Sequence, residues 1–90
     1  MAKVEVSWQR KDEEGQKVRV YAERFGGNWS FFRRHKRYDQ WKLDEAPPLV
    51  DWLELLDGVR RRMQRDLLPF DEDKKILKEI RERFPDERVK

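Results

Sequence analysis

The chain has 90 residues, of which 46% are charged and 37% hydrophobic, and 22 Lys and Arg against 19 Asp and Glu give a formal charge of +3. This length suits one small domain, and an aromatic content of 12% argues for a folded chain despite the many charges. Cys is absent and His35 is the single His, which excludes disulfides and thiolate chemistry and leaves too few ligands for a typical His-based metal site. We therefore expect a binding protein rather than an enzyme, with no cofactor and no metal.

The first half of the chain predicts an antiparallel β-meander. Apolar and polar residues alternate through residues 3–9 and again through 17–23, as in half-buried strands. A polar turn at 12–15 separates these strands, and Gly26-Gly27 allows a tight hairpin to a third strand over 28–36. Residues 38–43 predict either a short fourth strand or an extended arm.

The second half predicts two helices. Pro47-Pro48 suits a helix start, and apolar residues then recur at helical spacing up to Met63. Asp71 is a favourable N-cap for a second helix, which Pro85 ends. The fold expected is α+β: a three- or four-stranded antiparallel meander followed by two C-terminal helices packed on one face of the sheet.

We expect a single compact domain over residues 1–85, because neither half could bury its apolar face alone. Its sheet half covers 3–43 and its helical half 48–84, and residues 86–90 form a frayed tail. The expected core consists of the large apolar residues of both halves: Trp8, Trp29, Phe31, Trp52, Leu53, Leu56, Ile76, Leu77 and Ile80.

The Gly26-Gly27 turn also predicts the strand register. A two-residue loop pairs Phe25 with Asn28 and so places Tyr21 opposite Phe32, on the sheet face turned away from the helices. A three-residue loop would shift this register by one and bury Phe32. Trp41 or Tyr38 could fold back and cover the pair.

Two adjacent aromatic rings edged by cations are typical of surfaces that bind single-stranded nucleic acid, since bases stack on rings and phosphates meet cations. The excess charge lies in residues 1–45, with 11 basic and 8 acidic groups. The candidate binding surface comprises the aromatic pair and the basic residues near it: Arg19, Tyr21, Phe32, Arg33, Arg34, Lys36 and Arg37.

A protein-binding module is the alternative, because the same residue types are enriched at protein interfaces. The partner is then an acidic protein or a second copy of this chain. A purely structural interpretation also exists, since cross-strand aromatic pairs stabilise sheets. However, stability alone would not place Arg19 opposite Arg34.

A second basic cluster lies near the end of the first helix: Arg60, Arg61, Arg62 and Arg65. The helix dipole and an Asp57–Arg61 ion pair account for most of it. Three ion pairs of i,i+4 spacing are expected in the second helix: Lys75–Glu79, Lys78–Glu82 and Glu79–Arg83.

His35 is expected to be an ordinary strand residue, because the surrounding Arg and Lys disfavour the imidazolium that a general base must become. The first residues lack the apolar stretch of a signal peptide, and no run is long enough to span a membrane. We expect a cytoplasmic protein that does not bind membranes.

Overall fold

The computed structural model describes residues 4–25, 28–65, 68 and 71–87. The chain divides into two compact units, Met1–Pro47 and Pro48–Lys90. The boundary falls where the sequence changes from alternating to helical spacing. It remains a prediction that the helices cover the sheet and share its core.

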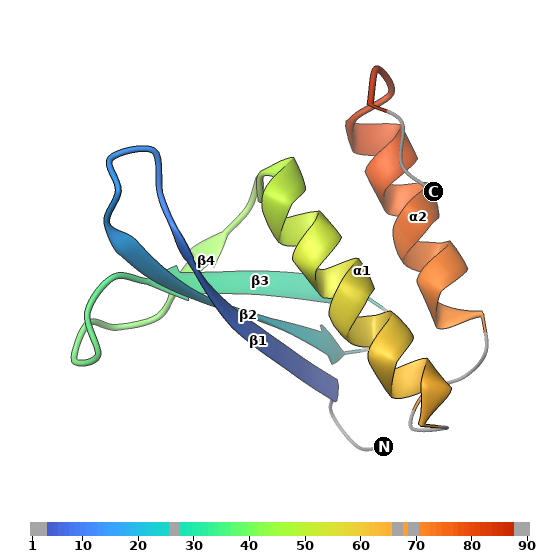
Figure 1. The fold of residues 1–90 in the computed structure, drawn as a ribbon, viewed down its shortest axis with the longest axis horizontal. Helices are drawn as coiled ribbons and strands as arrows, with labels where there is room; N and C mark the ends of the chain where they lie inside the picture. The colour runs from blue at the N-terminus through green and yellow to red at the C-terminus, as the bar shows by residue number, and fades with distance from the viewer. Residues whose placement is uncertain (1–3, 26–27, 66–67, 69–70, 88–90) are drawn as a thin grey trace. The chain divides into compact units, whose positions relative to one another are not determined.

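The first unit is a four-stranded antiparallel sheet in which each strand pairs with the next, in the order β1-β2-β3-β4 (Figure 1). The strands are β1 Val4–Lys11, β2 Lys17–Phe25, β3 Asn28–Arg34 and β4 Lys42–Asp44. The predicted meander is therefore confirmed, and it has a fourth strand. β3 ends two residues earlier than expected, and β4 has only three residues.

The register of the second hairpin is the predicted one. Phe25 pairs with Asn28, Tyr21 with Phe32 and Arg19 with Arg34. The alternative register, which would have buried Phe32, is wrong. Gly26 and Gly27, which carried the prediction, lie outside the described residues.

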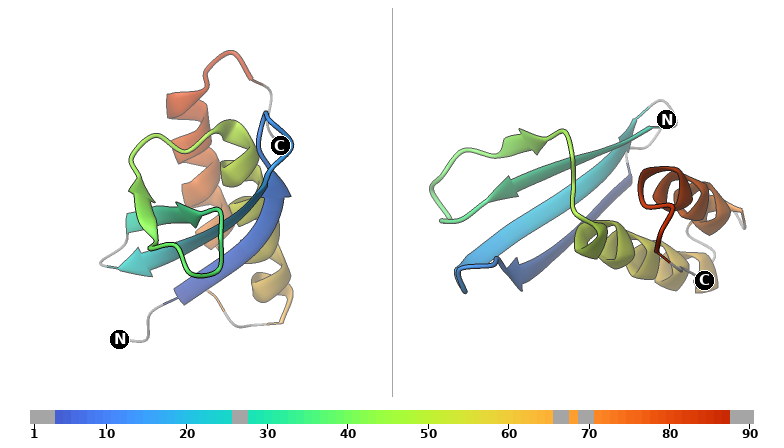
Figure 2. Two further views of the ribbon diagram at one scale, coloured as in Figure 1. Left: turned by 90° about the vertical axis from the view of Figure 1, so that its left-hand side faces the viewer. Right: turned by 90° about the horizontal axis from the view of Figure 1, so that it is seen from above.

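The two faces of the sheet differ in burial, because side chains alternate along each strand. The first face carries the buried apolar residues Val6, Val18, Val20, Ala22 and Phe31. The second face carries the Tyr21–Phe32 pair and is partly exposed. The strands cross at marked angles because the sheet is twisted (Figure 2).

The turn between β1 and β2 is held by Asp12. Its Oδ1 atom accepts hydrogen bonds from the backbone N–H groups of Glu14 and Gln16, both at 2.9 Å. Gly15 has φ +80°, a left-handed conformation that glycine adopts without the strain a side chain would add. This turn fixes the register of β1 against β2, in which Lys11 pairs with Lys17.

The second unit is a pair of antiparallel helices that lie side by side, α1 Leu49–Gln64 and α2 Glu72–Arg83 (Figures 1 and 2). Its buried apolar residues share one side of each helix: Trp52, Leu55, Leu56, Val59, Ile76 and Ile80. The prediction that Leu53 belongs to the core is wrong, since Leu53 is 39% exposed. At about 100° per residue, the face centred on Trp52, Leu55, Leu56 and Val59 leaves Leu53 beyond its edge.

Two further helix predictions have mixed outcomes. Asp71 occupies the N-cap position of α2 as predicted, but its side chain makes no capping hydrogen bond, and the backbone there (φ −106°, ψ 9°) is not the extended conformation usual at an N-cap. Lys75 lies 3.8 Å from Glu72 instead of pairing with Glu79, which pairs with Arg83 at 3.0 Å as predicted. α2 ends before Pro85, as expected.

Candidate functional site

An aromatic cluster of Tyr21, Phe32 and Trp41 lies on the second face of the sheet. Tyr21 and Phe32 stack with their ring centroids 4.8 Å apart and an interplanar angle of 18°. Trp41 lies before β4 and folds back, so that its ring meets Tyr21 at 4.6 Å and 87°. The Arg34 guanidinium covers the Trp41 ring at 4.3 Å. Of the two residues that could have covered the pair, Trp41 does so, whereas Tyr38 is 81% exposed.

This packing changes which ring a ligand could reach. Tyr21 and Phe32 turn one ring face toward each other, so no base can lie between them, and both residues are half-buried. Trp41 is 36% exposed and extends the cluster outward. The Tyr21–Phe32 pair thus supports Trp41, and Trp41 is the ring of this cluster most accessible to a ligand.

A shallow hollow lies beside Trp41 on the same face. It has a volume of about 290 Å³ and is lined by Glu5, Ser7, Tyr21 and Trp41. Two aromatic rings at right angles form one side, and a carboxylate and a hydroxyl from β1 form the other. Such a set offers stacking together with hydrogen bonding to the edge of a planar polar ring.

The second face carries two pairs of directly opposed cations, one adjoining the aromatic cluster and one a row further along the strands. Lys11 pairs with Lys17 across β1 and β2, and Arg19 pairs with Arg34 across β2 and β3. Like charges directly opposite each other destabilise a sheet. We call these four residues the basic end of the second face.

The other residues of the predicted surface lie apart from this face. Arg33 is opposite Val20, on the first face, because neighbouring residues of a strand point to opposite sides. Lys36 and Arg37 are exposed in the turn that follows β3, where Lys36 lies 5.9 Å from the Tyr38 ring. The structure therefore brings together Arg19, Tyr21, Phe32 and Arg34, and places Arg33, Lys36 and Arg37 elsewhere around the end of β3.

The opposite end of the second face is acidic and apolar. Glu5 pairs with Glu23 across β1 and β2. Phe25, at the end of β2, is 79% exposed. Leu43 lies opposite Phe32, beside the aromatic cluster, and is 55% exposed. The second face thus runs from cations, through aromatic rings, to carboxylates and exposed apolar side chains.

The second basic cluster is largely paired within its own helical unit. Arg60 lies 3.5 Å from Asp73, Arg61 pairs with Asp57, and Arg62 donates a hydrogen bond to the Gly58 carbonyl at 3.2 Å. Arg65 is exposed just beyond α1. These contacts favour the structural interpretation of the cluster over a ligand-binding one.

His35 lies beyond the end of β3 and not in a strand. Its Nε2 atom is 3.1 Å from Oδ2 of Asp12. The pKa of Asp12 is lowered, mainly because its carboxylate accepts the backbone N–H of Gln16, with a further contribution from His35. The Asp12–His35 contact thereby links the first turn to the segment after β3.

No group of His, Asp or Glu side chains within the described residues could hold a metal ion. No helix in that part of the chain is long and apolar enough to cross a membrane. Comparison of the chain with protein-family models, curated proteins and solved structures found no significant match.

Sequence reasoning missed the hollow and the Lys11–Lys17 pair. The pair follows from the length of the 12–15 turn, which sets the register of β1. The hollow had no comparable signal, because it depends on how Trp41 packs against a strand that is not adjacent in sequence.

Proposed function

We propose that the second face of the sheet binds single-stranded nucleic acid. The observation that carries this proposal is the position of two opposed cation pairs beside an aromatic-walled hollow on one face. The cations contribute phosphate contacts, and the hollow accepts a base against Trp41 with Ser7 and Glu5 at its edge.

The like-charge pairs are the reason to invoke a ligand. Each opposed pair costs the folded sheet about 0.2–1 kcal/mol relative to a neutral one. A phosphate backbone placed across Lys11, Lys17 and Arg19 relieves this repulsion. Arg34 adds a fourth phosphate contact, while its guanidinium also stacks on Trp41 and lies 3.4 Å from the Asp39 carbonyl oxygen.

The test is a fluorescence-anisotropy titration with short labelled single-stranded DNA and RNA at ~50 and ~200 mM salt. We expect binding that weakens steeply with salt, because phosphate contacts release counterions. Trp41→Ala should weaken binding by about 5- to 150-fold, the loss of one stacked base.

Tyr38→Ala is the matched control, because Tyr38 is an exposed ring of the same segment and does not line the hollow. Equal losses in both variants would mean that the hollow has no special role. Absence of binding at the lower salt concentration would refute the proposal.

A protein interface is the second candidate, favoured by the exposed apolar side chains of Phe25, Leu43 and Trp41 on the same face. A second copy of this chain or an acidic protein would cover them. Sedimentation velocity distinguishes the self-association case: a dimer that persists at high salt and is lost in Leu43→Glu supports an interface. A monomer at all concentrations argues against self-association.

A further inference from the structure

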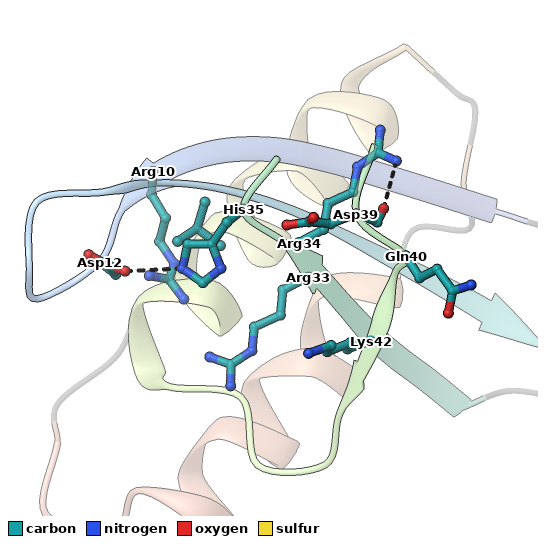
Figure 3. Close-up of a pocket in the computed structure, with 9 residues that line it drawn as sticks. Arg10, Asp12, Arg33, Arg34, His35, Asp39, Gln40 and Lys42 are labelled. Atoms are coloured by element: carbon teal, nitrogen blue, oxygen red, sulfur yellow. Dashed lines mark hydrogen bonds and ion pairs between the residues drawn. The ribbon is translucent and has the colours of Figure 1, made fainter. Parts of the chain in front are cut away.

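A second pocket, separate from the hollow beside Trp41, lies where β1 and β3 end and β4 begins. Its volume is about 370 Å³. The residues that line it all belong to the first unit: Arg10, Asp12, Val18, Arg33, Arg34, His35, Asp39, Gln40 and Lys42. We call it the strand-end pocket (Figure 3).

The charge of this pocket is positive: four cationic side chains line it against two carboxylates. Both carboxylates are engaged by the loops that carry them. Asp12 accepts two backbone N–H groups and contacts His35, and Oδ2 of Asp39 accepts the backbone N–H of Lys36 at 3.1 Å. The acids therefore organise the rim and leave cationic groups to face the pocket.

Arg33 and Lys42 contribute the positive charge that is available to a ligand. They oppose each other directly across β3 and β4, on the first face of the sheet. Both are exposed, and within the described part of the chain neither side chain has an ion-pair or hydrogen-bond partner. Figure 3 shows their charged ends on the same side of β3, near His35 and Arg10, whereas Arg34 points toward Asp39.

This opposed pair is unfavourable for an empty sheet, as on the second face. An anion held between the guanidinium of Arg33 and the ammonium of Lys42 removes the repulsion. A planar guanidinium donates two parallel hydrogen bonds to phosphate oxygens, and an ammonium adds a point charge. The His35 ring supplies a further polar group at the rim.

We propose that the strand-end pocket binds a phosphomonoester. Such a group carries a charge of about −1.5 to −2 at neutral pH, which matches the two cations, Arg33 and Lys42, whose side chains have no partner within the described residues. An internal phosphodiester carries a single charge and matches it less well. This site is distinct from the second-face surface, and its existence does not depend on nucleic-acid binding there.

The test is a calorimetric titration of the full chain with five probes: inorganic phosphate, adenosine monophosphate, adenosine, an oligothymidylate with a terminal phosphate, and the same oligothymidylate without it. We expect adenosine monophosphate to bind and adenosine not to bind. Arg33→Gln and Lys42→Gln should each weaken binding by about tenfold or more, the loss of a charge-assisted hydrogen bond. Lys74→Gln, an exposed cation of α2, is the control and should bind as the parent does.

The probes distinguish two sources of a phosphomonoester: the phosphorylated end of a nucleic acid and a small phosphorylated molecule. Tighter binding of the terminally phosphorylated oligonucleotide than of its unphosphorylated form, lost in Arg33→Gln, supports a nucleic-acid end as the ligand. Equal binding of the two oligonucleotides, with adenosine monophosphate or inorganic phosphate still dependent on Arg33, supports a small phosphorylated molecule. If no phosphorylated probe depends on Arg33 and Lys42 while circular dichroism shows both variants folded, the proposal is overturned.

Discussion

Replacing both lysines of the Lys11–Lys17 pair with Gln should raise stability and lower nucleic-acid affinity. The two residues oppose each other on the second face, and both are exposed. Neutralising them removes a repulsion, so the free energy of unfolding should rise by about 0.2–1 kcal/mol. The same change removes two of the four cations proposed to contact phosphates.

The loss of affinity can be estimated from counterion release. For a single strand each phosphate contact contributes about 0.7 to the slope of log affinity against log salt, so four contacts give about −2.8. The parent should then bind about 50-fold more weakly at ~200 mM than at ~50 mM salt. The double variant, with a slope of about −1.4, should weaken only about sevenfold over the same range.

Anisotropy titrations over this salt range measure both slopes, and urea unfolding measures the stability. The control is Lys74→Gln/Lys78→Gln, which makes the same change of net charge on exposed residues of α2. Its slope should equal that of the parent. If the Lys11/Lys17 variant keeps the parent slope, or if both double variants change it equally, the reasoning about local phosphate contacts is wrong.

Three further predictions concern stability and packing. Trp52→Ala should lower the free energy of unfolding by about 3–5 kcal/mol, because Trp52 is 2% exposed. Chemical denaturation measures this loss, and a variant as stable as the parent would contradict the packing described for Trp52. The folded-state pKa of Asp12 is lowered from its ordinary 3.8, so its ionised form stabilises the fold above that pH, and the contribution is lost as the pH falls through the lowered pKa. Asp12→Ala should therefore be less stable than the parent at neutral pH and nearly equal to it at ~pH 2. A difference in unfolding free energy that stays the same at both pH values would refute stabilisation by the ionised Asp12 carboxylate. Trp41→Ala should also lose the near-ultraviolet circular dichroism that arises from the Trp41–Tyr21 contact, while its far-ultraviolet spectrum stays unchanged; retention of the near-ultraviolet band would place Trp41 elsewhere.

The strand register was predictable because it depends on local features. A two-residue turn and strict alternation determine which residues of β2 and β3 oppose each other, and Tyr21, Phe32, Arg19 and Arg34 follow from it. The choice of face for Arg33 follows from the same alternation.

The features that escaped prediction depend on packing between segments distant in sequence. Trp41 could have extended into solvent, and its position is set by contacts with Tyr21 and Arg34. The strand-end pocket needs Arg10, Arg33 and Lys42 from three strands, and the register of β4 gave no sequence signal. Leu53 was misplaced because the apolar stripe of α1 is wider than its buried face.

The most direct test of nucleic-acid binding by the second face is a titration of the isotope-labelled chain with a short single strand, followed by heteronuclear NMR. Binding at the second face should shift the resonances of Lys11, Lys17 and Arg19 and of the indole N–H of Trp41, and leave the exposed residues of α2 unaffected. Shifts centred on α1 and α2, or no shifts at low salt, would contradict it.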